Sequence, residues 1–519
     1  MKRISLAGAL TAGALLTASA PLAGAPAATA QEPPRPNIIV IVADDLGYGD
    51  LSSYGSKIIR TPNLDALAAE GVRFTQGYVT HPVCAPSRAA ILTGRYQQRF
   101  GFEFNPVGRD RRGGVALSET FIGQVMREAG YRTAMVGKWH LGQAPGYQPL
   151  DRGFDEFFGI TAGASSYMID PQPGDEFHTP PGSEGSERAS TADPLPKEAT
   201  PRDRMVHARR MSPVLRGREP VEVKGYLTDA FTGDAVRFIG ENRHRPFFLY
   251  LAYNAPHTPL QVTAKYAERY RHVPDKGARV YAAMVSALDD GVGAIRAKLK
   301  AEGLERNTLV IFVSDNGCAA YVLGACSNAP LNGHKGSHLE GGVRVPYIVS
   351  WPGRIPGGRV DDRPVSSLDI APTAAALARG RLPKPADGVN LIPYLTGGNA
   401  AAPHPTLYWR AGPNFAIRDG DWKLWLANKA PPGTQVSHSA GITPDGTHAT
   451  VSPYGQHPML YDLKRDRGER RNLAPNRPTV VAALKAKLSA WDAGNAPPQW
   501  TSMRQSVKVH DRQALQIYD

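Results

Sequence analysis

Cysteine, long apolar runs and compact basic clusters are all scarce in this sequence. Three of the 519 residues are cysteine, and beyond the first 30 residues no apolar run approaches the length needed to cross a bilayer. The 60 Lys and Arg against 47 Asp and Glu give a formal charge of +13, yet there is no compact Lys/Arg run or basic-aromatic alternation. No repeat of solenoid length is present. These absences argue against stable membrane insertion, a nucleic-acid partner and a repeat architecture, and the diffuse positive charge favours anionic substrates.

The first 30 residues have the pattern of a secretory signal peptide. Lys2 and Arg3 precede an apolar run of Ala, Leu and Gly, and Ala28-Thr29-Ala30 offers small residues for cleavage. Removing two cations from a charge of +13 leaves +11 on the mature chain. We therefore expect an exported protein, periplasmic or secreted. Retention of the apolar run as a membrane anchor is the alternative.

The three cysteines have different expected fates in an oxidising compartment, where thiols tend to pair. Cys318 and Cys326 are close in sequence and would close one loop as a disulfide. Cys84 is then the odd cysteine. An unpaired cysteine in an exported protein needs an explanation, and a structural thiol is the simplest one.

A repeated order of strand, polar residues and helix predicts an α/β fold. The β-branched run Asn37 to Ala43 predicts a central strand buried on both faces. Further strands are expected at 72–79, 131–136, 247–252, 309–313 and 347–350. Helices are expected at 62–71, 120–129, 228–242 and 279–302. The order predicts a large mixed, mostly parallel sheet sandwiched by helices.

Polar side chains follow several of these strands at the point where each strand ends. Asp44 and Asp45 follow the first strand, and adjacent carboxylates repel each other unless a cation lies between them. The residues after other strands are Lys138, His140, His257, Asp315 and Asn316. Parallel strands bring their carboxyl ends to one sheet edge, so we expect these groups to converge, with Lys138 and His140 on one side of an extended segment. The Asp and Asn oxygens suit Ca²⁺ or Mg²⁺ rather than zinc, whereas a solvated turn and ordinary surface residues are the alternatives.

Two other regions differ in composition from the α/β pattern. Residues 171–224 are rich in Pro, Gly, Ser, Glu and Arg, which predicts a surface insertion, part loop and part disorder. Beyond about residue 375, short aromatic segments at 406–409, 422–425 and 459–463 predict a small antiparallel sheet, with a helix near 478–491 packed on it. The predicted organisation is a signal peptide over 1–30, an N-terminal α/β catalytic domain over 36–375 and a C-terminal subdomain over 376–519.

The stretch that begins at Cys84 predicts a helix with an anion-attracting start. Pro86 and Ser87 are helix-start residues, and Gly94 ends the helix-forming run. Cys84 is therefore expected at a helix N-terminus, which attracts anions. Arg88 lies one turn further on, so its guanidinium is expected to face the same anionic group.

This stretch, Cys-Ala-Pro-Ser-Arg followed by Thr-Gly-Arg up to Arg95, resembles the signature of the type I, formylglycine-dependent sulfatases of the alkaline phosphatase superfamily. The string Gly130 to Gly142 is similar to the second signature of that family, and the resemblance covers roughly residues 36–475. It implies an alkaline phosphatase-like fold. It also implies that a maturation enzyme oxidises Cys84 to formylglycine (3-oxoalanine), which would explain the unpaired cysteine.

The resemblance further implies a role for each polar residue. The metal, Ca²⁺ or else Mg²⁺, would be held by Asp44, Asp45, Asp315, Asn316 and the modified Cys84. Hydrated formylglycine, made more acidic by the metal and Arg88, would attack sulfur. His257, with Lys335, would protonate the leaving oxygen, and Lys138 with Lys335 would neutralise the sulfate oxygens. His140 would help to remove a proton from the second hydroxyl, so that sulfate leaves.

The expected activity is that of an arylsulfatase-like sulfuric ester hydrolase. The run Gln98 to Pro106 looks like that of secreted bacterial carbohydrate sulfatases, so the substrate is expected to be a sulfated carbohydrate, as in polysaccharide degradation, or a small aryl sulfate. Ser165 or Ser166 is a loosely matched candidate for a polar group near the sulfate. The alternatives are a phosphonate monoester or phosphodiester hydrolase of the same superfamily, and a non-catalytic binder of anionic glycans.

Overall fold

The structure is a computed structural model that describes residues 1, 35–106, 113–180, 200–322, 324–433, 441–442, 452–500, 502 and 504–518. Apart from Met1, the predicted signal peptide lies outside the described residues. None of the described helices combines the length and the apolar character that a membrane span requires. Residues 35–519 cluster as one unit, and the fold below is that of this unit.

A mixed sheet of 11 strands carries the fold of the described residues. At its centre β1 (Asn37–Ala43) is buried along its whole length and runs parallel to β10 (Thr308–Ser314) and β8 (Phe247–Ala252). Beyond β8, the strands β3 (Arg132–Lys138) and β4 (Glu156–Ile160) continue in the same direction. The predicted mostly parallel sheet is confirmed.

Antiparallel pairs occur toward both edges of the sheet. β11 (Arg344–Ser350) runs against β10, and β2 (Gly71–Tyr78) runs against β11. The short outer strands are β12 (Arg359–Asp361) and β13 (Val365–Ser366) beside β2, and β6 (Leu215–Arg216) and β7 (Glu219–Pro220) beyond β4. The outermost β12 and β13 pair parallel to β2. The main order is β12-β2-β11-β10-β1-β8-β3-β4-β6-β7.

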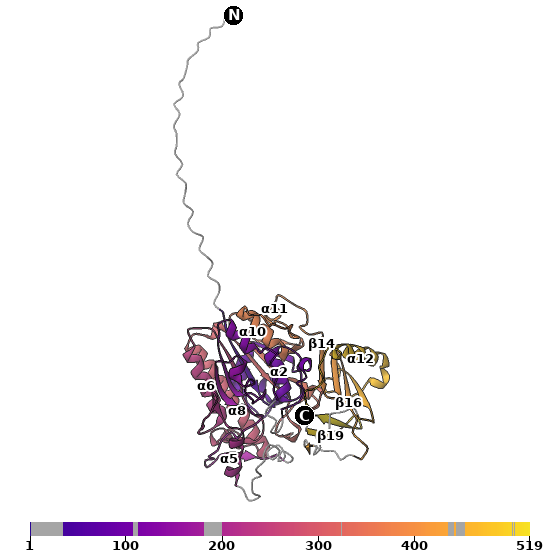
Figure 1. Cartoon of the computed structure of the whole chain (residues 1–519), viewed down its shortest axis with the longest axis horizontal. Helices are drawn as coiled ribbons and strands as arrows, with labels where there is room; N and C mark the ends of the chain where they lie inside the picture. The colour runs from indigo at the N-terminus through magenta and orange to yellow at the C-terminus, as the bar shows by residue number, and fades with distance from the viewer. Residues whose placement is uncertain are drawn as a thin grey trace. The chain divides into compact units, whose positions relative to one another are not determined.

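Helices cover both faces of the sheet because side chains of β1 alternate between two cores. Ile39 and Ile41 lie in one core, with residues of α1 (Pro62–Ala69), α6 (Leu227–Glu241) and α8 (Lys276–Ala301). Ile38 and Val40 lie in the other core, with α2 (Cys84–Thr93), α3 (Ile122–Glu128) and α10 (Ile370–Ala378) (Figure 1). Each such buried side chain stabilises the fold by about 1.5–3 kcal/mol.

The C-terminal part adds a second sheet. The strands β14 (Thr406–Ala411), β15 (Asn414–Asp419), β16 (Trp422–Asn428) and β18 (Gln456–Asp462) pair antiparallel in that order. Helix α12 (Pro478–Asp492) lies beside this sheet (Figure 1). Its Leu484 and Leu488 share one hydrophobic cluster with Ile417 and Leu424 of the sheet. The predicted small sheet and its helix are thus present. A further sheet of β17 (Gly441–Ile442), β19 (Arg504–His510) and β20 (Gln513–Tyr518) was not predicted.

The remaining elements are short, with one exception. They are β5 (Glu176–His178), β9 (Leu260–Val262), α7 (Ala264–Ala267), α9 (Glu340–Val343) and α11 (Ile392–Leu395). The exception is α5 (Pro201–Met211), which the expectation of loop and disorder over 171–224 had omitted. Its signal is in the sequence: Thr200 and Asp203 form a capping box, and Pro201 occupies the first helical position.

Most expected element ends differ from the observed ones by up to three residues. The proposed boundary at residue 375 falls within α10, which packs against α2 and α3. The division into a catalytic domain and a C-terminal subdomain therefore stays a prediction.

Candidate active site

Four parallel strands deliver the predicted residues to one edge of the sheet. Asp44 and Asp45 follow β1, Lys138 ends β3, His257 lies just beyond β8, and Asp315 follows β10. Backbone hydrogen bonds continue past the strand ends, from Asp315 N to Ala43 O and from Asp44 N to Ala255 O, both 3.0 Å. They hold the loops together where the polar side chains emerge.

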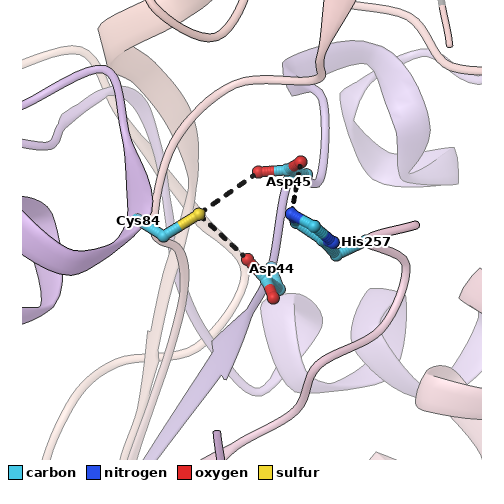
Figure 2. Close-up of side chains that lie close together, drawn as sticks. All are labelled: Asp44, Asp45, Cys84 and His257. Atoms are coloured by element: carbon cyan, nitrogen blue, oxygen red, sulfur yellow. Dashed lines mark hydrogen bonds and ion pairs between the residues drawn. The ribbon is translucent and has the colours of Figure 1, made fainter. Parts of the chain in front are cut away.

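Cys84 lies at the first position of α2, after an extended Val83 (φ −137°). The helix ends at Gly94, whose φ of 67° is in the left-handed region that glycine favours. The Cys84 thiol donates to Asp44 Oδ1 at 3.4 Å, and its Sγ lies 3.7 Å from Asp45 Oδ1 (Figure 2). Cys318 and Cys326 form a disulfide, so Cys84 is the free cysteine. Burial raises the pKa of the Cys84 thiol, against the effect of Lys138 and Lys335.

Three cationic side chains neutralise three carboxylates around Cys84. Lys138 Nζ donates to Asp44 Oδ2 at 2.7 Å, and Arg88 Nε donates to Asp315 Oδ2 at 2.8 Å. Lys335 Nζ donates to both oxygens of Asp45 at 2.8 and 2.9 Å and lies 3.2 Å from Cys84 Sγ. Each pair joins one positive and one negative charge, so the three pairs together carry no net charge.

Arg88 is fully buried among these groups. Its Nη1 donates to the Lys138 carbonyl at 2.8 Å and its Nη2 lies 3.5 Å from Asp44 Oδ1, while its exposed fraction is 0%. The guanidinium therefore pairs with the carboxylates around Cys84, and its Nη2 has no hydrogen-bond partner among the described residues.

Burial and neighbouring charges shift the pKa values of the acids in this cluster in opposite directions. Burial opposes ionisation of Asp45, but Lys335 and His257 hold its pKa well below the usual range. Burial and the neighbouring Asp44 raise the pKa of Asp315 to about 6 despite Arg88. Burial lowers the pKa of His257 to about 3, so this imidazole is neutral near pH 7.

The donor set fits a hard divalent cation. Ligand atoms of Asp44, Asp45, Cys84 and His257 lie within 4.8 Å of one another. Asp315 Oδ1 accepts from Asp45 N at 3.2 Å, and Asn316 Nδ2 donates to Asp45 Oδ1 at 2.8 Å. Asn316 Oδ1 is buried with no hydrogen-bond partner among the described residues, which leaves one more oxygen donor for a metal. His257 enters this cluster although it was not predicted as a ligand, with Nε2 3.6 Å from Asp45 Oδ2.

His140 has a backbone conformation that was not expected. Its φ of 61° is left-handed, so the segment is not extended at His140. The ring packs on Gly163, where a Cβ atom would lie 2.7 Å from Nε2. Ser165 Oγ donates to Ser212 O at 2.8 Å and Ser166 Oγ has no partner among the described residues, so neither hydroxyl forms a hydrogen bond with the cluster.

Three tyrosines that the sequence did not single out contact the same groups. Tyr321 Oη donates to Asp45 Oδ2 at 3.5 Å, and Tyr281 Oη donates to the Asp45 carbonyl at 3.4 Å. Tyr167 Oη donates to the carbonyl of His257 at 2.8 Å. Only Tyr321 had a signal, since it lies within the loop that Cys318 and Cys326 close.

The family model described as "Sulfatase" matches residues 36–380. The chain belongs to the sulfatase family. This sulfatase is 36% identical to arylsulfatase A of Homo sapiens, over 87% of the chain and 86% of that protein. It is 35% identical to steryl-sulfatase of Mus musculus, over 88% of the chain and 81% of that protein. The predictions of an enzyme and of the family are confirmed.

Solved structures agree with the fold. Ps i-CgsB, solved in complex with k-i-k-neocarrahexaose, is 33% identical with a TM-score of 0.73, and the match covers 90% of this sulfatase and 95% of that chain. The phosphonate monoester hydrolase of Agrobacterium radiobacter is 20% identical with a TM-score of 0.58, over 93% and 100% of the two chains. The second likeness shows the fold alone, and the alkaline phosphatase-like class is confirmed.

Proposed function

We propose that this sulfatase hydrolyses the sulfate ester of a carbohydrate at a centre built from an oxidised Cys84 and a divalent cation. The observation that carries the proposal is the position of Cys84, a free cysteine buried among Asp44, Asp45 and Lys335. Ps i-CgsB, whose structure holds a neocarrahexaose, supports a carbohydrate substrate. A small aryl sulfate is the second substrate that we propose for the same centre.

The metal would be held by the oxygens of Asp44, Asp45, Asp315 and Asn316 together with the group at position 84. We propose Ca²⁺, with Mg²⁺ as the alternative, because all four protein ligands offer hard oxygen atoms. When bound, the cation supplies a Lewis acid for a sulfate oxygen. The three carboxylates are already balanced by Arg88, Lys138 and Lys335, so a divalent cation leaves the site positive for an anionic ester.

Position 84 would supply the nucleophile after a maturation enzyme of the host has oxidised Cys84 to formylglycine. The hydrate of formylglycine offers one oxygen that attacks sulfur and a second hydroxyl through which sulfate is expelled. The chain prepares this position in two ways. Position 84 is the first residue of α2, where the helix dipole favours a negative charge. Lys335 Nζ is 3.2 Å from Sγ and can donate to the group that replaces the thiol.

Proton transfer would fall to the two histidines. His257 Nδ1 lies 2.6 Å from the Thr258 carbonyl, so Nδ1–H donates there and Nε2 faces the cluster. Because His257 is neutral near pH 7, its Nε2 would first have to take up a proton; Asp45, 3.6 Å away, favours the imidazolium, which would then protonate the leaving oxygen with the help of Lys335. His140 Nδ1 has no partner among the described residues and would accept the proton from the second hydroxyl. Lys138 and Lys335 would neutralise the sulfate oxygens.

Two measurements test this proposal. Peptide mass spectrometry across Thr80–Arg88 is expected to show an aldehyde in place of the Cys84 thiol in active protein. Parallel kcat/KM values for an aryl sulfate, a phosphate diester and a phosphonate monoester are expected to be highest for the sulfate. A higher value for either phosphorus ester would favour the alternative hydrolase. An unmodified Cys84 with tight glycan binding and no sulfate release would favour the non-catalytic binder.

We also propose that the protein is exported through residues 1–30. N-terminal sequencing of protein recovered from the periplasm or medium is expected to begin after Ala30. A mature protein that retains Lys2 and Arg3 would show that the segment is not cleaved.

A further inference from the structure

Arg209 is a buried cation without a counter-charge among the described residues. It lies near the end of α5, and its exposed fraction is 8%. Its Nη2 donates to the Ser166 carbonyl at 2.6 Å. Its Nε and Nη1 are both buried and have no hydrogen-bond partner in the described part of the chain. Most of the N–H groups of this guanidinium therefore lack an acceptor.

Two other buried arginines of this sulfatase show what Arg209 lacks. Arg88 Nε donates to Asp315 Oδ2 at 2.8 Å, and Arg410 Nε donates to Glu103 Oε1 at 3.0 Å. Burial opposes the charge of both arginines, but these carboxylates raise their pKa values. Burial alone acts on Arg209 and lowers its pKa to about 10. Arg209 is thus desolvated like the paired arginines, without the negative charge that compensates them.

Two buried serine hydroxyls lie in the same region. Ser166 Oγ and Ser212 Oγ have no hydrogen-bond partner among the described residues, and the two residues are 1% and 6% exposed. Ser166 carries the carbonyl that Arg209 contacts, and Ser212 is the residue that follows α5. Ser165 Oγ donates to the Ser212 carbonyl at 2.8 Å, which joins the end of α5 to the same loop. A guanidinium and two hydroxyls, all able to donate, therefore meet where α5 contacts this loop.

The missing partner of these groups is an acceptor with a negative charge. A guanidinium has no acceptor atom, whereas a hydroxyl can donate to an anion. Water would satisfy the N–H groups but would leave the buried positive charge uncompensated. The low exposed fractions of Arg209, Ser166 and Ser212 favour a small inorganic anion over a sugar chain, which needs an open approach.

This contact joins α5 to the core of the protein. Met205 of α5 belongs to the same hydrophobic cluster as Tyr167, the residue after Ser166. Tyr167 Oη in turn donates to the His257 carbonyl at 2.8 Å. An ion between α5 and this loop would therefore hold the helix on a part of the core that also supports His257.

We propose that Arg209, Ser166 and Ser212 bind a small inorganic anion, a halide or an oxyanion of the sulfate type, between α5 and the loop at 165–166. The anion accepts a charge-assisted hydrogen bond from the guanidinium and hydrogen bonds from the hydroxyls. It is a structural ligand, separate from the sulfate ester that the enzyme hydrolyses, so the inference does not depend on the proposed function.

Crystals grown with bromide or with selenate, an analogue of sulfate, locate the anion by its anomalous scattering. A bromide peak beside the Arg209 guanidinium identifies a halide site. A selenate peak at that position identifies an oxyanion site. Absence of both peaks overturns the proposal and leaves water as the partner of the buried donors.

Thermal unfolding tests the same site in solution. Sodium chloride or sodium sulfate is compared with sodium gluconate, a large organic anion, at equal ionic strength. The small anion that binds is expected to raise the unfolding midpoint saturably, by about 2 °C or more, because a ligand of the native state stabilises that state. Arg209→Gln is expected to abolish this increment. Ser166→Ala and Ser212→Ala are each expected to raise its half-saturating concentration severalfold.

Arg202→Gln is the matched control. Arg202 lies on the same helix, and its side chain is 65% exposed beside Asp170, so this variant removes the same charge from α5 outside the buried site. It is expected to keep the full increment. Sulfate bound at the candidate active site would stabilise wild-type and Arg209→Gln protein alike, so the difference between these two proteins reports on the proposed anion. An equal increment in both would overturn the proposal.

Discussion

Two buried clusters of charge in this sulfatase look alike, and we propose that they serve different ends. The first is the proposed reaction centre around Cys84, with Asp44, Asp45 and Asp315 paired to Arg88, Lys138 and Lys335. The second, here the junction cluster, consists of Tyr78, Glu340, Arg344, Lys423 and Glu469. There Lys423 Nζ donates to Glu340 Oε1 at 2.8 Å and lies 3.1 Å from Glu469 Oε1. Glu340 Oε2 accepts from Tyr78 Oη at 2.7 Å and from Arg344 Nη1 at 3.1 Å.

In both clusters the pKa of one carboxylic acid is lowered and the pKa of another is raised. Around Cys84, the pKa of Asp45 is lowered and that of Asp315 is raised. In the junction cluster burial opposes ionisation, but Lys423 lowers the pKa of Glu340 to about 2, whereas burial raises that of Glu469 to about 8. Carboxylates with strongly shifted pKa values are therefore not sufficient to identify a catalytic site in this protein.

The difference lies in access and in the reactive atom. Glu340, Lys423 and Glu469 have side chains with an exposed fraction of 0%. With Tyr78 they link β2 of the large sheet and helix α9 to β16 of the C-terminal sheet. The reaction centre contains a free cysteine, and the side chains of Lys335 and His257 are 9% and 13% exposed. We infer that the junction cluster stabilises the fold and that the reaction centre does chemistry. Four experiments test this contrast.

The largest expected effect is the loss of turnover in Cys84→Ala. Removing a nucleophile costs on the order of 10⁶ in kcat in well-studied hydrolases, and here the substitution also removes the site of oxidation. Sulfate release and the unfolding midpoint are the two measurements. We expect no detectable turnover and an unfolding midpoint within a few degrees of the wild type. Turnover near the wild-type rate would refute the role of position 84.

The junction cluster is expected to show the opposite response. Lys423→Met leaves Glu340 and Glu469 buried without their shared cation, which is expected to cost about 3–5 kcal/mol in unfolding free energy. Urea unfolding measures this loss, and kcat per folded molecule is expected to stay close to that of the wild type. A stable variant with a large loss of kcat would place Lys423 in the chemistry instead.

Metal removal should affect the reaction centre alone. A ligand that binds only the native state at 100 times its Kd adds about 2.7 kcal/mol of stability. Dialysis against a chelator is expected to abolish sulfate release and to lower the unfolding midpoint by a corresponding amount. Added Ca²⁺ should restore both, and Asp45→Asn should make the midpoint insensitive to the chelator. Full activity of chelator-treated, metal-free protein would contradict the proposed cation.

The smallest expected effect is a pH dependence of stability that comes from Glu469. Its pKa is about 8 in the folded state against an ordinary value of 4.5, so between these values the folded protein holds a proton that the unfolded chain releases. Stability contributed by this group therefore falls as pH rises, by up to about 1.4 kcal/mol per pH unit.

Glu469→Gln keeps a neutral side chain and should remove that slope. Urea unfolding of the variant and the wild type at about pH 6 and pH 7 compares the two slopes directly. Parallel curves for the two proteins would show that Glu469 is ionised in the fold throughout this range.

Local pattern was enough to predict much of the fold. The β-branched run of β1 and the aromatic segments of β14, β16 and β18 each predict their strands, since buried strands need continuous or alternating apolar residues. The hairpin β19–β20 and helix α5 were missed because their residues are mostly polar and their stability comes from what they pack against.

The residues of the candidate site were predictable because each follows an apolar strand or lies in a recognisable motif. Their spatial relations were not, since these depend on loops whose conformation is set by distant partners. The left-handed φ of His140, the contact of Arg88 with the Lys138 carbonyl and the approach of Tyr321 to Asp45 are examples.

The sequence by itself determined the family, the strand-end positions of Asp44, Lys138, His257 and Asp315, and the free state of Cys84. Tertiary structure alone decided which buried charges meet, because an ion pair joins side chains up to hundreds of residues apart and leaves no local pattern. It also decided which cluster has access to solvent. The same types of acid and base therefore form the proposed reaction centre in one place and a fully buried junction in another.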